Sequence, residues 1–354
     1  MSVYTNAIRF WAAFKKEEET IKKALSQQDY GTLNPIVEDL DDLAIELTGS
    51  HFFVENIYDD YECTFDTGPN KTGQYLAWYF VQMAPVDIKR NWILNSCLPP
   101  LSSKAILAGV QIQNQTYSIE DFMVSYGVDD NQDLMHAKVY CDGWSLIDNT
   151  ENKKEMSMYL LELALGEIAY EAYLSSIDYQ DSIDEKELVC PLVDFYEKVM
   201  NIVEAKNWKQ YDHPFDIYSV YQPIQDFAHD SLRKDMKLIF TTHPLLVEET
   251  IESKNDVLSD LAFRQGEYGY IYFANPYGNE QDAKLRQELS KVLDTNFFMA
   301  KAGKVIGGAI GKSYSYIDCI VFDKKRFMNA FNQIKKKFDS NVEIYYRSFS
   351  TSEE

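Results

Sequence analysis

The residues best suited to bind an anion lie in "GKVIGGAIGKSYSYIDCIVFD", residues 303–323, where glycines precede Lys312 and Ser313. A phosphate-binding loop needs glycine, four residues and then Gly-Lys-Ser or Gly-Lys-Thr between a strand and a helix, because backbone amides at the helix start hold the phosphate. The position that must be the first glycine is Ile306, and the residues after Ser313 alternate as in a strand. We therefore reject a phosphate loop and expect these glycines to let a strand bulge or approach a neighbour closely.

Base stacking by tyrosines is a second chemistry that this region allows. In the common RNA-recognition fold the third strand reads basic, Gly, aromatic, small, aromatic, aliphatic, any, aromatic, and its aromatic residues stack on bases. The residues that match are Lys312, Tyr314, Tyr316 and Ile317, whereas Ser313, Ser315 and Cys319 depart from the pattern. The run "IYFAN", residues 271–275, resembles the companion motif of the first strand and presents Tyr272. Single-stranded RNA is therefore an alternative ligand.

Carboxylates, histidines and cysteines form no catalytic or metal-binding motif. Glu162, Glu167 and Glu171 have roughly helical spacing, which suits acid–base chemistry but is also typical of the solvated face of an acidic helix. No two of the five histidines are four residues apart, and the five cysteines include no CxxC pair. We expect reduced, mostly buried thiols, no metal and no cofactor.

Enzyme signatures such as G-x-S-x-G and HExxH are also missing from the sequence. We therefore expect a protein that is not an enzyme. A hydrolase remains an alternative, since the paired carboxylates of glycosidases leave no local motif.

The periodicity of the first two thirds of the chain predicts helices followed by strands. Helical patterns cover residues 5–25, 33–49, 74–85, 152–179 and 187–208, and extended runs cover residues 51–60, 61–68, 122–129 and 134–142. At 354 residues the chain exceeds what one core usually organises. We predict an α+β fold of two domains, residues 1–232 and residues 233–349, with a tail at residues 350–354.

The sequence of the last third of the chain predicts strands and helices in an order that is typical of a known fold. Strand, helix, strand, strand, helix and strand follow one another at residues 267–276, 280–294, 304–312, 314–323, 324–338 and 341–349. This order resembles the ferredoxin-like βαββαβ arrangement, an antiparallel four-stranded sheet with both helices on one face. A further strand over residues 235–244 is expected at an edge.

Charge is the strongest compositional feature. The formal net charge is −22; residues 266–349 hold 13 Lys or Arg and 9 Asp or Glu, a charge of +4, and the tail holds Glu353 and Glu354, so residues 1–265 carry −24. An acidic body of this size attracts basic partners by long-range steering, although acidic surfaces also serve solubility. No signal-peptide core and no run of about 18 apolar residues is present, which predicts a cytoplasmic protein without a membrane partner.

Three stretches carry a family resemblance. "FWAAFKKEEETI", "MAPVDIKRNWILNSCLPP" with Trp92, and "LGEIAYEAYLSSIDY" resemble a loosely defined family of uncharacterised bacterial proteins over residues 8–180. Members of such families are often met beside antibacterial toxin genes as immunity or accessory proteins. The resemblance implies a biological neighbourhood, that of toxin and immunity genes, more than a chemistry; the acidic charge, the many tyrosines and the missing catalytic motifs favour a protein that binds another protein. We predict docking of a basic protein through exposed aromatic residues, with Trp92 among the binding residues.

Overall fold

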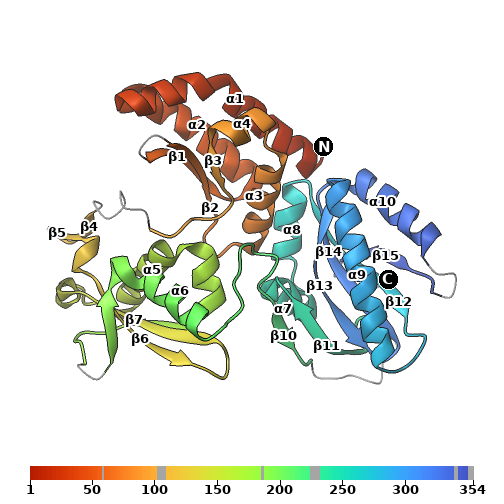
Figure 1. The fold of residues 1–354 in the computed structure, drawn as a ribbon. Coiled ribbons are helices and arrows are strands. Elements are labelled where there is room, and N and C mark those ends of the chain that lie inside the picture. The colour runs from red at the N-terminus through yellow and green to blue at the C-terminus, as the bar shows by residue number, and fades with distance from the viewer. Residues whose placement is uncertain (58–59, 102–108, 185–186, 224–231, 339–341, 350–354) are drawn as a thin grey trace.

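The protein is a mixed α/β chain whose strands form several separate sheets (Figure 1). The computed structural model describes residues 1–57, 60–101, 109–184, 187–223, 232–338 and 342–349. We call residues 1–97 the amino-terminal unit, residues 98–218 the acidic lobe and residues 219–349 the carboxy-terminal unit. The tail predicted at residues 350–354 lies outside the described residues.

The amino-terminal unit packs helices against a small sheet. Its elements are α1 (Val3–Gln27), α2 (Tyr30–Thr48), β1 (His51–Ile57), β2 (Asp60–Asp66), α3 (Lys71–Met83), α4 (Val86–Asn91) and β3 (Ile93–Asn95). Ser2 and Thr5 form a capping box that starts α1. Phe10 and Phe14, four residues apart on α1, both contact Phe52 of β1 edge to face. The helices predicted near residues 5–25, 33–49 and 74–85 are confirmed.

The acidic lobe has a hydrophobic core of its own. Its elements are β4 (Gly109–Ile112), β5 (Gln115–Ser118), β6 (Met123–Asp129), β7 (Leu134–Tyr140), α5 (Thr150–Tyr173), β8 (Leu174–Tyr179), β9 (Leu188–Pro191) and α6 (Phe195–Ala205). Four strands pair in the order β8-β7-β6-β9, and β4 pairs with β5. Buried residues of α5 and α6 share the core with this sheet.

Two predicted helices of the acidic lobe are too long. The pattern over residues 152–179 is helical only to Tyr173, because the following residues form β8 and pair with β7 in parallel. The pattern over residues 187–208 begins as β9, which pairs with β6, and becomes helical only at Phe195. In both places pairing with a strand distant in sequence overrides the local helical period.

The carboxy-terminal unit contains a six-stranded sheet. Its elements are β10 (Ser219–Tyr221), β11 (Met236–Thr241), α7 (Pro244–Glu252), α8 (Asp256–Phe263), β12 (Glu267–Ala274), α9 (Glu280–Met299), β13 (Gly303–Gly311), β14 (Tyr314–Val321), α10 (Lys324–Lys337) and β15 (Tyr345–Ser348). The strands pair in the order β10-β11-β13-β14-β12-β15. From β12 to β15 the elements follow the order predicted for residues 267–349. The boundary predicted between residues 232 and 233 falls between β10 and β11, which pair with each other.

Different elements pack against the two faces of this sheet. Side chains of α9 and α10 share a core with one face of β12 and β14. At the opposite face, residues of α7, α8 and the sheet join the core of the amino-terminal unit. Tyr79 of α3, for example, stacks on Phe322 just after β14 with ring centroids 4.1 Å apart. The first and last parts of the chain therefore share one hydrophobic core, as their neighbouring positions in Figure 1 indicate.

The glycines of β13 have the structural role that their sequence predicts. The pairing of β13 with β14 shifts register between Val305 and Gly307. A Cβ atom on Gly308 would collide with the carbonyl oxygen of Tyr316, and one on Gly311 would collide with the carboxylate of Asp235. A strand with side chains at these positions could not approach its neighbours so closely.

Candidate functional site

The Gly-Lys-Ser turn between β13 and β14 already holds an anionic group of the chain itself. Asp235 Oδ2 accepts the N–H groups of Ser313 at 2.7 Å and Tyr314 at 3.1 Å. The carbonyl oxygen of Asp235 accepts the N–H of Lys312 at 2.9 Å. Strand β14, not a helix, follows the turn. Backbone amides that a phosphate would need are thus bound to a carboxylate that is 7% exposed.

Tyr316 is a core residue, which contradicts its prediction as a stacking platform. Its ring is fully buried. Its hydroxyl donates to Asp235 Oδ1 at 2.6 Å and accepts the N–H of Arg233 at 2.8 Å. The Arg233 guanidinium binds Asp318 at 2.6 and 3.3 Å and lies 4.7 Å from the ring centroid of Phe349. This segment before β11 covers the ring, so no base can reach it.

Tyr272 and Tyr314 remain partly exposed on the same face of the sheet. They lie on neighbouring strands with ring centroids 5.9 Å apart. Tyr345 of the edge strand β15 stacks on Tyr272 at 5.4 Å, with the rings inclined by 26°. Lys312 is exposed at the nearby turn. We call Tyr272, Tyr314 and Tyr345 the tyrosine patch; its third member was missed because the sequence motif covers only two strands.

Trp92 belongs to the core of the amino-terminal unit, which contradicts its predicted binding role. It is 4% exposed and packs against Phe14 and Tyr61, with centroid distances of 5.1 and 5.3 Å. Its indole N–H donates to Glu18 at 3.1 Å. The aromatic residue that the family resemblance singled out stabilises the fold.

Glu167 is a buried carboxylate between the acidic lobe and the amino-terminal unit. Its Oε1 accepts the backbone N–H of Thr67 at 2.7 Å, and those of Gly68 and Leu98 at 3.2 Å. Its Oε2 accepts the Thr67 hydroxyl and the amide of Gln74. Burial raises the pKa of Glu167 to about 7, although the hydrogen bonds from Thr67 and Leu98 act in the opposite direction.

Further buried polar groups join the amino-terminal unit to the acidic lobe and to the carboxy-terminal unit. Lys71 Nζ binds Glu171 at 2.5 Å, and burial lowers the pKa of Lys71 while Glu171 opposes that shift. Burial, and then the charge of Lys71, lower the pKa of His243 to about 3, so the imidazole is neutral. Its Nδ1 accepts the N–H of Leu246, which places the proton on Nε2, 3.3 Å from the Thr72 hydroxyl. These side chains have partners within the chain and act as structural contacts between units.

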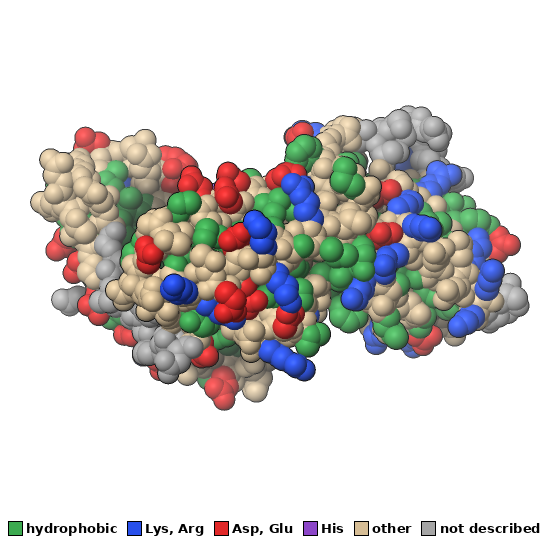
Figure 2. All heavy atoms as spheres, turned by 90° about the horizontal axis from the view of Figure 1, so that it is seen from above, with side chains coloured by type: hydrophobic (Ala, Val, Ile, Leu, Met, Phe, Trp, Pro, Cys, Tyr) green, Lys and Arg blue, Asp and Glu red, His purple; other side chains and the backbone are tan. Residues whose placement is uncertain are grey.

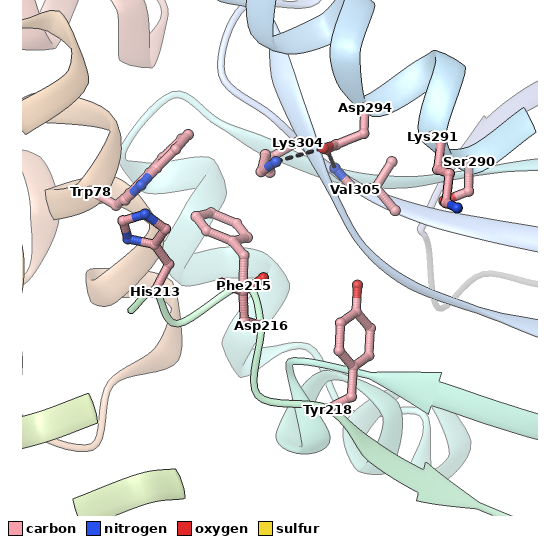
Figure 3. A pocket seen from close by; sticks show the side chains of 10 residues that line it. All are labelled: Trp78, His213, Phe215, Asp216, Tyr218, Ser290, Lys291, Asp294, Lys304 and Val305. Atoms are coloured by element: carbon pink, nitrogen blue, oxygen red, sulfur yellow. Dashed lines mark hydrogen bonds and ion pairs between the residues drawn. The ribbon is translucent and has the colours of Figure 1, made fainter. Parts of the chain in front are cut away.

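A half-open pocket of about 250 Å³ lies where all three parts of the chain meet (Figure 3). Trp78 comes from α3, Phe215 and Tyr218 from the last residues of the acidic lobe, and Lys304 from β13. Residues 290–294 of α9 close the opposite side. Sequence analysis missed this pocket, because its residues come from four segments and share no local pattern.

Negative charge gathers on the acidic lobe and positive charge at the far end of the carboxy-terminal unit. Residues 98–218 contain 22 Asp or Glu and 8 Lys or Arg, a net charge of −14. In Figure 2 Lys and Arg side chains crowd the right-hand end, which is the carboxy-terminal unit, whereas acidic side chains dominate towards the left. Lys138, Lys153 and Lys206 already pair with carboxylates within the lobe. Among the described residues of the lobe, most of the other acidic side chains are exposed, and Glu167 is the buried exception.

Among the described residues, no helix has the length and apolar character that a membrane span requires. No three His, Cys, Asp or Glu side chains in this part of the chain gather as metal ligands would. All five cysteines are free and buried, as predicted. No protein-family model, no curated protein and no solved structure matches the chain.

Proposed function

We propose that this protein is a non-enzymatic binding module whose acidic lobe docks a basic protein. The observation that carries the proposal is the net charge of −14 on residues 98–218. A concentrated field of one sign raises the rate of encounter with a partner of opposite sign. Neutralisation of a basic bacterial toxin in the cytoplasm is the most concrete form of this function, and it rests on the family resemblance.

The outer side of α5 is the docking surface that we propose. Met158 and Tyr159 are each three or four residues from Glu155 and from Glu162, and are therefore neighbours of both carboxylates on the helix surface. Tyr159 is 60% exposed and Met158 41% exposed. An exposed tyrosine between carboxylates suits a protein surface rich in Lys and Arg, because the ring offers contact area and a cation–π face.

The test is capture of the partner from the cells that make the protein, followed by measured binding of the identified partner. Tyr159→Ala should weaken binding at least tenfold, as expected for an aromatic hot spot. Tyr30→Ala is the matched control, because Tyr30 is 59% exposed on α2 of the amino-terminal unit. The association rate should fall roughly tenfold when NaCl rises from about 50 to 500 mM. A partner without net positive charge, or a rate independent of salt, contradicts the proposal.

Single-stranded RNA binding by the carboxy-terminal unit is the second candidate. We propose that residues 233–349 form the ferredoxin-like domain of a two-domain α+β protein, with the tyrosine patch on the sheet face opposite α9 and α10. The exposure of Tyr272 and Tyr314 on adjacent strands favours this candidate. Cations flank the patch: Lys335 Nζ lies 4.7 Å from the ring centroid of Tyr345, and Arg347 lies 6.0 Å from that of Tyr272.

Filter binding with a single-stranded RNA pool tests this candidate. Replacing Tyr272 and Tyr314 together by Ala should reduce affinity at least tenfold, since stacking is worth about 1–3 kcal/mol per base. Tyr159 lies on α5 and is not part of the tyrosine patch. The Tyr159→Ala variant should therefore bind the RNA as the wild type does. Equal binding by the double variant and the wild type removes RNA as the ligand.

A further inference from the structure

Trp78 differs from other buried tryptophans of the protein in its indole N–H. The N–H groups of Trp11, Trp92 and Trp144 donate to Phe80, Glu18 and Val139 at 2.7, 3.1 and 2.9 Å. Trp78 is 6% exposed, and its N–H has no acceptor among the described residues. Buried donors are nearly always paired, so this N–H is available to an acceptor that lies outside the described residues.

The pocket beside Trp78 also offers a fixed cation. Lys304 Nζ lies 5.9 Å from the ring centroid of Trp78 and 5.8 Å from that of Phe215. Asp294 holds it there: Oδ2 binds Lys304 at 2.5 Å, and Oδ1 accepts the N–H of Val305 at 2.9 Å. Because Asp294 uses both oxygens within the chain, it positions the ammonium and leaves other N–H groups of Lys304 for a ligand.

Phe215 and Tyr218 supply aromatic walls, and the space is small; the other lining residues are His213, Asp216, Ser290, Lys291 and Val305. Phe215 is backed by Tyr75, with stacked rings 4.3 Å apart, and is therefore held rigidly. Tyr218 lies at the other end of the pocket, on the side of Ser290 and Lys291 (Figure 3). A volume of about 250 Å³ is just below the range of roughly 300–1,000 Å³ for larger ligands, which limits the occupant to one or two rings.

We propose that this pocket binds a small aromatic carboxylic acid. The ligand carboxylate accepts the N–H of Trp78 and faces the ammonium group of Lys304. Its ring lies against Phe215 and extends towards Tyr218. A cation as ligand is disfavoured, because Lys304 already takes the cation position near the Trp78 and Phe215 rings.

Nuclear magnetic resonance of the 15N-labelled protein tests this directly. Indole-3-carboxylate and 4-hydroxybenzoate are titrated at pH 7, with their uncharged amides as neutral counterparts. The indole N–H signal of Trp78, assigned from Trp78→Phe, should move with either acid. The signals of Trp11, Trp92 and Trp144 should stay in place, because their N–H groups are already bonded.

The variants Trp78→Phe and Lys304→Gln should each weaken binding of the acids about tenfold or more, since each removes a donor to a charged group. Lys336→Met, which removes an exposed charge on α10, should leave binding unchanged. Two results overturn the proposal without any variant: a Trp78 signal that neither acid moves at about 10 mM, or equal affinity for the acids and the amides. Neither result bears on docking at α5.

Discussion

At the residue scale, two tyrosine side chains on the same strand differ in their exposure to solvent. Alternation along β14 correctly placed Tyr314 and Tyr316 on one face of the sheet. Tyr314 is partly exposed, whereas Tyr316 is buried beneath Arg233 and Asp235. Those two covering residues are about 80 positions away in sequence, so no pattern within the strand reports them. The spacing of residues therefore predicted the face, and only the fold determined the exposure.

Glu167 is a second residue whose exposure is determined by the fold and not by its spacing in the sequence. Its spacing from Glu162 and Glu171 is compatible with a solvated helix face, yet it is 1% exposed. A glycine break in α5 and the loop around Thr67 bury it, and neither is visible in the spacing of carboxylates.

Replacing Glu167 by Gln should change how stability depends on pH. Burial raises the pKa of Glu167 from 4.5 to about 7, so the folded state holds this proton more tightly than the unfolded chain. Its contribution is complete below about pH 4.5 and is lost as the pH rises to about 7. The free energy of unfolding of Glu167→Gln, relative to wild type, should therefore increase by roughly 3 kcal/mol between pH 4.5 and pH 7.5. Urea unfolding at several pH values measures this.

Glu155→Gln is the control for this prediction, because Glu155 is exposed on the same helix. His243 gives the opposite slope in the wild type, since its pKa is lowered to about 3. Comparing each variant with wild type at the same pH cancels that contribution. Parallel curves for wild type and Glu167→Gln would contradict the assigned pKa.

At the element scale, α5 is interrupted at Gly166. This residue has φ 70° and ψ 159° inside the helix. A Cβ there would lie 2.7 Å from the carbonyl oxygen of Leu98 and from backbone atoms of Pro99 and Pro100. The break lets the 98–100 segment pass against the helix, with Glu167 N–H donating to the Leu98 carbonyl at 3.0 Å. The helical pattern over residues 152–179 gave no sign of this, since glycine is tolerated in helices.

Gly166→Ala should destabilise the protein by about 2–5 kcal/mol, from backbone strain and the collision with the 98–100 segment. Gly31→Ala is the matched control in α2, where a new Cβ would approach only Asp29 Oδ1, at 3.6 Å. Because Gly31 is helical and has room, that substitution should stabilise by up to about 1 kcal/mol. Thermal unfolding of the two variants compares them. A stabilising shift for Gly166→Ala would show that Gly166 is an ordinary helical glycine.

At the scale of the whole molecule, sequence and structure divide the chain differently. The sequence predicted one acidic domain over residues 1–232. In the structure the acidic lobe has a separate core, while the amino-terminal unit shares its core with residues 246–322. Order along the chain predicts which elements form. It does not report contacts between elements more than 200 residues apart, which are decided by shape and by the apolar area each surface must bury.

The reactivity of the buried cysteines can test whether the two hydrophobic cores open separately. Cys141 and Cys190 belong to the core of the acidic lobe, and Cys63 belongs to the core shared by the two ends of the chain. Burial raises the pKa of all three thiols, so they react only after local opening. In mild urea, Cys141 and Cys190 should be alkylated by iodoacetamide at a common rate that differs from that of Cys63. Mass spectrometry of tryptic peptides gives the rates.

Fully denatured protein supplies the reference in which all five cysteines react. One rate for Cys63, Cys141 and Cys190 in mild urea would mean that the whole molecule opens as a single unit, against the arrangement of the cores.

The shared core has a consequence for synthesis of the chain. The N–H of Tyr4 donates to the carbonyl of Phe322, and Ser2 donates to Asp323. Helices α1 and α3 thus obtain part of their final cover only after residues 246–322 have been synthesised, whereas the acidic lobe, which lies between these two parts in sequence, can close earlier. During that interval Tyr79, which stacks on Phe322 in the folded protein, is incompletely covered. Chaperones that recognise apolar helices therefore have a defined window and a defined target on this nascent chain.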